Sequence, residues 1–479
     1  MCATRLQPPA DAGHQDGNTS ASNIVDGGNG GGGNSVGGNV VSGDVVGNNV
    51  VAGATSRRRF LRGVVVAAPA LLLTARSRAA DGMQVPGQSP APQAPLSTPL
   101  PALQAPSQLR PGAGFTPYGM PSRNERGTVR RIAANRDVAG NGVALTPLED
   151  LEGTITPNGL HYERHHNGVP AIDPASHRLV VHGLVKQPLA FAVADLLRYP
   201  MRSETLVIEC SGNSNVAWHH EPMQRPVGSM HGLVSCSEWT GVPLALLLDE
   251  AGVDAAATWA IIEGADGFNF SISLPLAKLR QDCFIGLYQN GERLRPEQGY
   301  PLRLIVPGWR GHLHVKWLHR IELASAPRLA RNETAAYSTL MPDGSARIFD
   351  FALGVKSLIT SPTHGQTVPA PGPVMLSGLA WSGAGAIAVV DISTDGGQHW
   401  QPATLQTPVL PRAFCRFRYA WNWDGTPAIL QSRATDASGA VQPTRAALIA
   451  ARGYNNFYHF NGIVSWQVED DGSVSHVYA

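Results

Sequence analysis

Cysteine and charge are both scarce in this sequence, and each scarcity excludes a class of protein. Five cysteines in 479 residues are too few for a disulfide-stapled scaffold, which uses cysteine far more densely. The formal net charge of +1 leaves no positive excess to hold a polyanion, so we expect no nucleic-acid role. No stretch of 18 or more consecutive apolar residues occurs, and we therefore expect no membrane span.

Motifs for common redox cofactors are missing as well. No Gly-x-Gly-x-x-Gly segment follows a predicted strand and no Gly-Lys-Ser/Thr loop exists, which disfavours a nucleotide cofactor. There is no Cys-x-x-Cys-His site and no iron–sulfur cluster spacing, so we expect no haem in this chain. His161 and His165 have the spacing of a helical zinc site, but the prolines and glycines around them disfavour a helix.

The chain does contain a long leader of unusual composition. Glycine and proline concentrate in the first part of the sequence, and residues 17–53 alternate Gly and Asn with Val and Ser. Such a composition is typical of a disordered segment, or of a stretch upstream of a later translation start.

About 365 residues then remain, enough for two well-filled cores. The 43% hydrophobic content is that of a globular protein.

An export signal is predicted next. Arg57, Arg58 and Arg59 precede Phe60 and Leu61, and a short apolar run follows at 63–75. This pattern indicates a twin-arginine signal, which exports folded proteins to the periplasm. We expect a leader with its signal peptide at 1–80 and a semi-rigid proline-rich linker at 81–113.

The first folded domain is predicted at 114–325, with a connecting segment at 326–356. Helical spacing is predicted for 189–199 and 243–250, and strands for 205–210, 302–306 and 315–323. Short strands interleaved with short helices favour an α+β domain over a doubly wound sheet.

The remaining residues, 357–479, have the pattern of an all-β domain. Strands are predicted at 374–382, 386–393 and 414–423. In the last of these, Arg416 and Arg418 alternate with Phe417 and Tyr419, which predicts an apolar face and a polar face. We expect an immunoglobulin-like sandwich, a fold that is also used by non-catalytic binding modules.

Cys210 is the residue that the pattern alone singles out. It closes a predicted buried strand, with Leu206 and Ile208 on the same face, and enters the turn Ser211-Gly212-Asn213. A thiolate could be exposed there among backbone N–H groups. Free cysteines are more often inert core residues, so both readings stay open at this point.

Four dispersed segments resemble the sulfite oxidase family of molybdenum enzymes, and within it most closely the SoxC-type sulfane dehydrogenase subunits. The resemblance covers about two thirds of the chain. It is carried by Glu209-Cys210-Ser211-Gly212-Asn213, Tyr162-Glu163-Arg164-His165-His166, Gly299-Tyr300-Pro301-Leu302-Arg303 with Val315-Lys316-Trp317-Leu318, and Ala451-Arg452-Gly453-Tyr454-Asn455-Asn456. It implies an α+β molybdopterin-binding domain followed by an immunoglobulin-like dimerisation domain.

The resemblance also assigns roles to residues. Cys210 would be the thiolate ligand of molybdenum, a soft donor suited to a sulfur-rich metal. Catalytic or substrate-binding roles would fall to Arg164, Tyr337 and Arg452, with Arg225 filling a further basic position. The cofactor-binding residues would be Tyr162, Glu163, Arg164, His165, His166, Asp266, Gln298, Arg303, His314, Val315 and Lys316.

Departures from the family pattern bear on the substrate. Ser214 and Asn215 stand where eukaryotic members carry arginines, and Val389 replaces another arginine. Because the pocket then has fewer fixed cations, we expect the substrate to be sulfur delivered on a carrier protein rather than free sulfite. The resemblance then implies a periplasmic sulfane dehydrogenase of thiosulfate oxidation, a homodimer within a hetero-oligomer, with a c-type cytochrome subunit as electron acceptor. A free-sulfite dehydrogenase and a non-catalytic binding module remain alternatives.

Overall fold

The structure is a computed structural model that describes residues 4–5 and 113–479. The predicted leader and linker lie, apart from residues 4, 5 and 113, outside the described residues. The twin-arginine signal therefore stays a prediction. No helix in the described part of the chain is long and apolar enough to cross a membrane.

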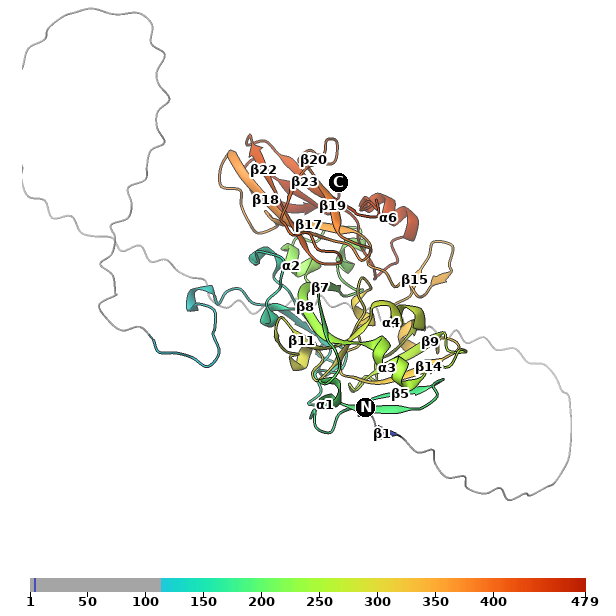
Figure 1. Cartoon of the computed structure of the whole chain (residues 1–479). Coiled ribbons are helices and arrows are strands. Elements are labelled where there is room, and N and C mark those ends of the chain that lie inside the picture. Colours follow the sequence, from blue (N-terminus) through green and yellow to red (C-terminus); the bar gives the residue numbers. More distant parts are fainter. Residues whose placement is uncertain (1–3, 6–112) are drawn as a thin grey trace, which may run out of the picture. The chain divides into compact units, whose positions relative to one another are not determined.

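The first domain contains a six-stranded mixed sheet (Figure 1). One pair of its strands, β5 and β14, is parallel, and the remaining pairs are antiparallel. The helices α3 (Leu244–Ala251) and α4 (Leu276–Asp282) share its apolar core. In sheet order the strands are β1 (Thr4–Arg5), β6 (Leu189–Ala192), β5 (Arg178–Gly183), β14 (Leu318–Ala324), β9 (Trp259–Gly264) and β10 (Ser271–Pro275).

A second sheet of this domain carries the strand that ends at Cys210. Leu206 and Ile208 are fully buried in one apolar cluster, and Cys210 packs against it, so the predicted shared face is observed. A separate three-stranded sheet joins β2 (Arg131–Ala134), β3 (Gly142–Leu145) and β4 (Glu163–His165). The strands of the second sheet are β12 (Glu292–Arg293), β11 (Phe284–Gln289), β8 (Val234–Pro243) and β7 (Arg202–Glu209), and β13 (Arg303–Ile305) also pairs with β11.

The helix predicted at 189–199 is wrong in its first half. Residues Leu189–Ala192 form β6, which pairs with β5, and only Val193–Leu196 form a helical turn, α1. Leu189 and Phe191 are both buried at alternate positions. A short apolar run fits helical and strand spacing equally well, and here the open edge of β5 provides a pairing partner that the local pattern cannot show.

The second domain consists of two antiparallel sheets. Trp381, Phe417 and Trp466 are buried in its core. The predicted immunoglobulin-like architecture is consistent with this arrangement. One sheet has the order β17 (Lys356–Ser361), β18 (Gly372–Trp381), β22 (Cys415–Trp423), β21 (Thr404–Leu405), and the other has the order β20 (Gln401–Pro402), β19 (Ile387–Ser393), β23 (Ala428–Asp436), β24 (Ser465–Val468), β25 (Val474–Val477).

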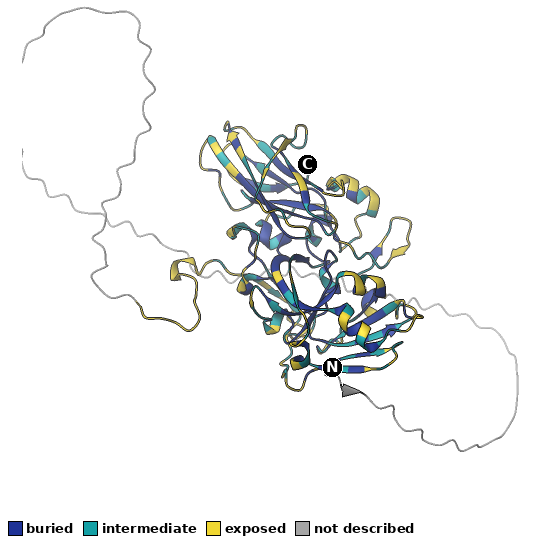
Figure 2. Cartoon of the chain, in the orientation of Figure 1, coloured by how far each residue is buried: buried dark blue, intermediate teal, exposed yellow. Residues whose placement is uncertain are grey.

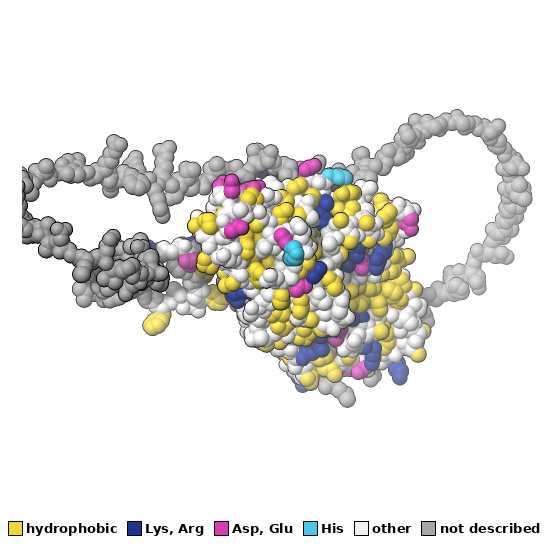
Figure 3. Space-filling view, turned by 90° about the horizontal axis from the view of Figure 1, so that it is seen from above, with side chains coloured by type: hydrophobic (Ala, Val, Ile, Leu, Met, Phe, Trp, Pro, Cys, Tyr) yellow, Lys and Arg dark blue, Asp and Glu magenta, His cyan; other side chains and the backbone are white. Residues whose placement is uncertain are grey.

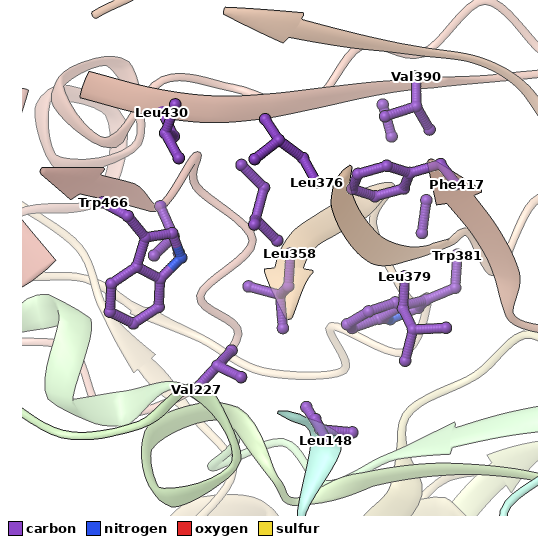
Figure 4. Packing of buried hydrophobic residues seen from close by; sticks show 14 of the residues in the cluster. Leu148, Val227, Leu358, Leu376, Leu379, Trp381, Val390, Phe417, Leu430 and Trp466 are labelled. Carbon is purple, nitrogen blue, oxygen red and sulfur yellow. The ribbon is translucent and has the colours of Figure 1, made fainter. Parts of the chain in front are cut away.

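One apolar core continues from the second domain into the first (Figure 4). Leu148 and Val227 of the first domain lie in the same cluster as Leu358 and Leu379 of the sandwich. Val227 begins helix α2 (Val227–His231). Figure 2 shows the buried residues running through both sheets of the sandwich. Burial of apolar surface, the dominant stabilising contribution to folding, therefore also holds the two domains together.

Arg416 lies on the predicted polar face of its strand, but it is buried there. Its side chain is 1% exposed and donates to the carbonyls of Gly153 at 2.8 Å and Leu151 at 3.0 Å. Arg418, two residues on, is half-buried and pairs with exposed Glu152. The polar face of β22 is thus partly an interdomain surface rather than a solvated one.

The predicted connecting segment 326–356 contains helix α5 (Arg331–Thr334) and the strands β15 (Thr339–Leu340) and β16 (Ala346–Arg347). The predicted domain limits stay predictions. On the face of the molecule seen in Figure 3, acidic and basic side chains are interspersed. That mixture agrees with the balanced net charge of the chain.

Candidate active site

The Cys210 turn lies directly after β7, at the end of a fully hydrogen-bonded strand. The Cys210 N–H donates to the Leu233 carbonyl at 2.9 Å, and the Asn213 N–H donates to the Cys210 carbonyl at 2.9 Å. Burial raises the pKa of the Cys210 thiol. A thiol in such surroundings is protonated at neutral pH, and a coordinated metal ion is what would keep it as the thiolate.

A cavity opens at Cys210. It collects side chains from β4, from the turn after β7, from β13 and from the segment before β14, which are far apart in sequence. Gly311 permits the approach of its loop, because a Cβ there would lie 2.7 Å from the Glu209 carbonyl oxygen. The predicted site residues in the lining are Tyr162, Arg164, His165, His166, Cys210, Asp266, Gln298, Arg303, His314, Val315, Lys316 and Tyr337.

Two buried cations in this cavity have no ion-pair partner among the described residues. Arg303 donates to the carbonyls of Gln298 at 3.0 Å and His314 at 3.2 Å, and its Nε has no partner. Lys316 Nζ donates to the carbonyls of Arg164 and Glu297. Burial lowers the pKa of Lys316 to about 7 and that of Arg303 to about 10. Buried charges are normally compensated, so these residues fit a bound anionic group such as a phosphate.

Neutral rings and a second guanidinium also line the cavity. Arg164 donates to the Asn141 side chain at 2.8 Å and lies 3.2 Å from His166 Nδ1. Burial and the nearby Arg164 charge lower the pKa of His166 to about 3, so its ring is neutral. Tyr337 stacks on His312, with ring centroids 4.2 Å apart, and has a φ of +51°. Left-handed backbone at a bulky residue is strained, and such strain concentrates at functional sites.

A second, smaller cavity also reaches Cys210. Arg452 and Arg310 line it together with His459 and Asn461. Both guanidiniums pair with Asp350, at 3.1 Å for Arg310 and 3.5 Å for Arg452. Arg164 and Arg452 therefore belong to different domains and different cavities, and both cavities include Cys210 of the same chain.

Two predicted site residues lie outside both linings. Arg225 is exposed and lines neither cavity. Its neighbour Pro226 precedes α2, and Gln224 bonds to the His476 carbonyl at 2.7 Å, which keeps this segment at the surface. Glu163 stands behind the cavity wall, where it bonds to Arg130 and accepts from His165 Nε2 at 2.8 Å.

The cavities also contain residues that the sequence analysis did not assign to a site. Arg310 is a buried guanidinium of the second cavity, and burial lowers its pKa to about 9. Both ring nitrogens of His459 are buried without a partner. His459 follows the recognised segment 451–456 by three residues, and that proximity was the available signal. His312 also lines the larger cavity, and no role was predicted for it.

Comparison with known families assigns both domains. Residues 166–331 match the molybdopterin-binding domain of oxidoreductases, and residues 347–465 match the dimerisation domain of molybdenum-cofactor oxidoreductases.

Several characterised proteins are similar in sequence. The mitochondrial sulfite oxidase of Rattus norvegicus is 34% identical over 273 residues, which is 53% of this chain and 50% of the rat protein. The sulfite oxidase of Gallus gallus is 31% identical over 64% of this chain and 72% of the chicken protein. The NADH nitrate reductase of Solanum lycopersicum is 30% identical over 58% of this chain and 34% of the tomato protein. The chain spans about half the length of the mammalian sulfite oxidases that it matches.

One solved structure matches over its whole length. The sulfane dehydrogenase SoxCD of Paracoccus pantotrophus superimposes with a TM-score of 0.76 at 40% identity, covering 80% of this chain and 100% of that chain. The two domains occur in the predicted order, and the predicted resemblance to the sulfite oxidase family is confirmed. The chain belongs to the sulfite oxidase family of molybdenum enzymes.

Proposed function

We propose that this protein is a molybdenum-dependent sulfane dehydrogenase that oxidises sulfur bound to a carrier protein in thiosulfate oxidation. The observation that carries the proposal is Cys210, which opens into a cavity whose buried cations Arg303 and Lys316 form no ion pair with any residue that the structure describes. In the proposed reaction each oxygen atom added to sulfur comes from water, with release of two protons and two electrons. A separate c-type cytochrome subunit accepts the electrons one at a time.

The residues of the larger cavity fit the molybdenum–molybdopterin cofactor. Cys210 would supply the protein's thiolate ligand, and Arg303 and Lys316 would pair with the anionic end of the pterin. Gln298 and His314 already hold Arg303 in position through their carbonyls. When bound, the cofactor supplies two-electron oxygen-atom transfer.

Arg164 and Arg452 are the residues proposed to hold the oxidised sulfur group. A guanidinium is planar and charged at any physiological pH, so it can bind two oxygens of a sulfonate or sulfite group at once. Tyr337 hydroxyl lies 3.4 Å from His166 Nε2. Burial raises the pKa of Tyr337, and it therefore acts as a neutral hydrogen-bond donor.

The choice of sulfane over free sulfite rests on two observations. The similarity to the sulfane dehydrogenase of Paracoccus pantotrophus extends over all of that chain. Ser214 bonds to Lys356 and His231 instead of presenting a cation to the cavity, and Arg225 is exposed at the surface. Fewer cations beside Cys210 suit a substrate whose binding energy comes largely from its carrier.

Steady-state assays with cytochrome c as acceptor distinguish the alternatives. We expect a higher kcat/KM with a sulfur-loaded carrier than with free sulfite. Turnover of free sulfite alone would instead make the protein a sulfite dehydrogenase. A purified protein with no stoichiometric molybdenum would refute the enzymatic proposal and favour a binding module.

We further propose that the protein acts in the periplasm as a homodimer joined to its cytochrome subunit. The arginine pair at 57 and 58 supports export by the twin-arginine route. Replacing both residues by lysine should leave folded, cofactor-loaded protein in the cytoplasm, and a normal periplasmic yield would refute this route. Sedimentation of the purified chain tests the dimer, which the match to a dimerisation domain supports.

A further inference from the structure

The carboxylate of Glu209, the residue before Cys210, is held largely by the second domain. Lys356 Nζ donates to Glu209 Oε1 at 2.8 Å, and Trp381 Nε1 donates to Glu209 Oε2 at 2.8 Å. Lys356 begins β17 and Trp381 ends β18, two neighbouring strands of the sandwich. We propose that Lys356 and Trp381 position the Cys210 thiolate through Glu209, so that the second domain is part of the support of the metal site.

Lys356 contacts both ends of the loop that contains Cys210. Besides Glu209, its Nζ donates to Ser214 Oγ at 2.7 Å. Ser214 has a φ of +64°, a strained conformation for a residue other than glycine, and its hydroxyl also bonds to His231 Nδ1 at 2.6 Å. One ammonium group therefore fixes the residue before and the residue after the turn that carries the thiol.

Hydrogen bonds within the turn transmit this constraint to Cys210. Asn213 Nδ2 donates to Glu209 Oε1 at 2.9 Å, while Asn213 Oδ1 accepts from the Leu233 N–H at 3.0 Å. The Leu233 carbonyl in turn accepts from the Cys210 N–H. A displacement of the Glu209 side chain would consequently shift Asn213 and the backbone on both sides of the thiol.

Burial makes the Glu209–Lys356 pair sensitive to the loss of either partner. The Lys356 side chain has no exposed surface and that of Glu209 is 10% exposed. A buried carboxylate left without its cation is strongly unfavourable, so the loop would rearrange to expose Glu209 to solvent. Mutation of a residue that orients a metal ligand typically lowers metal affinity or activity by roughly 10–100-fold.

This inference rests on the proposed role of Cys210 as the metal ligand, and the test separates the two. The full-length, molybdenum-loaded protein is treated with iodoacetamide, and alkylation of Cys210 is followed by peptide mass spectrometry. X-ray absorption at the molybdenum edge counts the sulfur ligands. In the wild type, Cys210 should be protected relative to metal-free protein. A count of sulfur ligands in Cys210→Ser equal to that of the wild type would overturn the ligand assignment, and the inference with it.

Lys356→Met is the decisive variant, and Arg416→Met is its matched control. Both remove a buried interdomain cation, but Arg416 contacts Gly153, Leu151 and Ser377 and not the Cys210 loop. In Lys356→Met we expect Cys210 to be alkylated at least about tenfold faster than in the wild type, with one sulfur ligand fewer. Arg416→Met should lower Tm and leave both measurements unchanged.

Trp381→Phe keeps the test decisive if Lys356→Met does not fold, because it removes one donor to Glu209 and retains a ring in the core. It should accelerate Cys210 alkylation to a smaller extent. The folded variants could instead keep the wild-type protection of Cys210 and the wild-type number of sulfur ligands. That result would overturn the positioning role of Lys356 and Trp381 and leave the ligand assignment standing.

Discussion

Arg416 offers a quantitative test of how the two domains are joined. Its guanidinium makes three hydrogen bonds, to the carbonyls of Gly153 and Leu151 and to the Ser377 hydroxyl, all within 3.0 Å. Arg416→Met keeps most of the volume and removes every one of these bonds. The two carbonyls lie at the interdomain contact and would lose their charged donor.

The expected loss of stability is about 3 kcal/mol. Hydrogen bonds to a charged donor contribute roughly 1.5–3 kcal/mol each. Three such bonds would exceed this total, but the cost of burying the guanidinium offsets part of their gain. A loss of this size lowers Tm by roughly 5–10 °C in a domain of about 200 residues.

Arg418→Met is the appropriate control, because it lies on the same face of the same strand. Its side chain is 41% exposed, and its ion-pair partner Glu152 is 74% exposed. Exposed pairs of this kind contribute less than about 1 kcal/mol. Differential scanning calorimetry of both variants measures the difference directly. Equal Tm values for the two variants would refute the interpretation of Arg416 as an interdomain anchor.

Three further predictions concern the site and its protonation. Cys210→Ser should stay folded and lose turnover, and full activity with bound molybdenum would remove Cys210 from the metal. Arg452→Met should lower kcat/KM by about two orders of magnitude at nearly normal molybdenum content, whereas wild-type kinetics would place substrate binding elsewhere. Burial lowers the pKa of His476 to about 4. Below about pH 6.5 the ring is therefore protonated in the unfolded chain while it stays neutral in the folded protein, and the folded protein loses stability as the pH falls. At pH 5 this amounts to at most about 2 kcal/mol; the drop in Tm between pH 7 and pH 5 should be smaller in His476→Gln, and an identical drop would exclude His476 as the cause.

The local sequence pattern predicted those helices and strands whose conformation does not depend on pairing with a distant segment. The strand expected at 205–210 is β7 (Arg202–Glu209), and the helix expected at 243–250 is α3 (Leu244–Ala251). In both segments the spacing of the apolar residues fits only one type of secondary structure. Helix α3 also ends at Gly252, which has a left-handed φ of +65°. The segment at 189–199 failed because its strand half is decided by pairing with β5, which no local pattern contains.

The functional segments were recognisable through resemblance, but the side chains that support them were not. Glu209 and Lys356 are 147 positions apart, and nothing in either local sequence indicates the pair. Arg310 and His459 likewise reach Cys210 only through the fold. Arg416 alternates with Phe417 and so lies on the predicted polar face of its strand. That face is nevertheless covered, because residues 151–153 of the other domain pack on it. Alternation predicts a face and does not predict what packs on it.

The two cavities that meet at Cys210 differ in how their cations are balanced, and this difference suits them to different ligands. Arg303 and Lys316 form no ion pair among the described residues, and burial lowers the pKa of both, so their charged forms are unfavourable until an anion binds beside them. An anion bound there removes that cost for as long as it stays, which favours a resident group. Arg310 and Arg452 already share Asp350, so the smaller cavity is partly neutralised when empty. An anion gains less by binding there and leaves more readily, as a substrate and its oxidised product must.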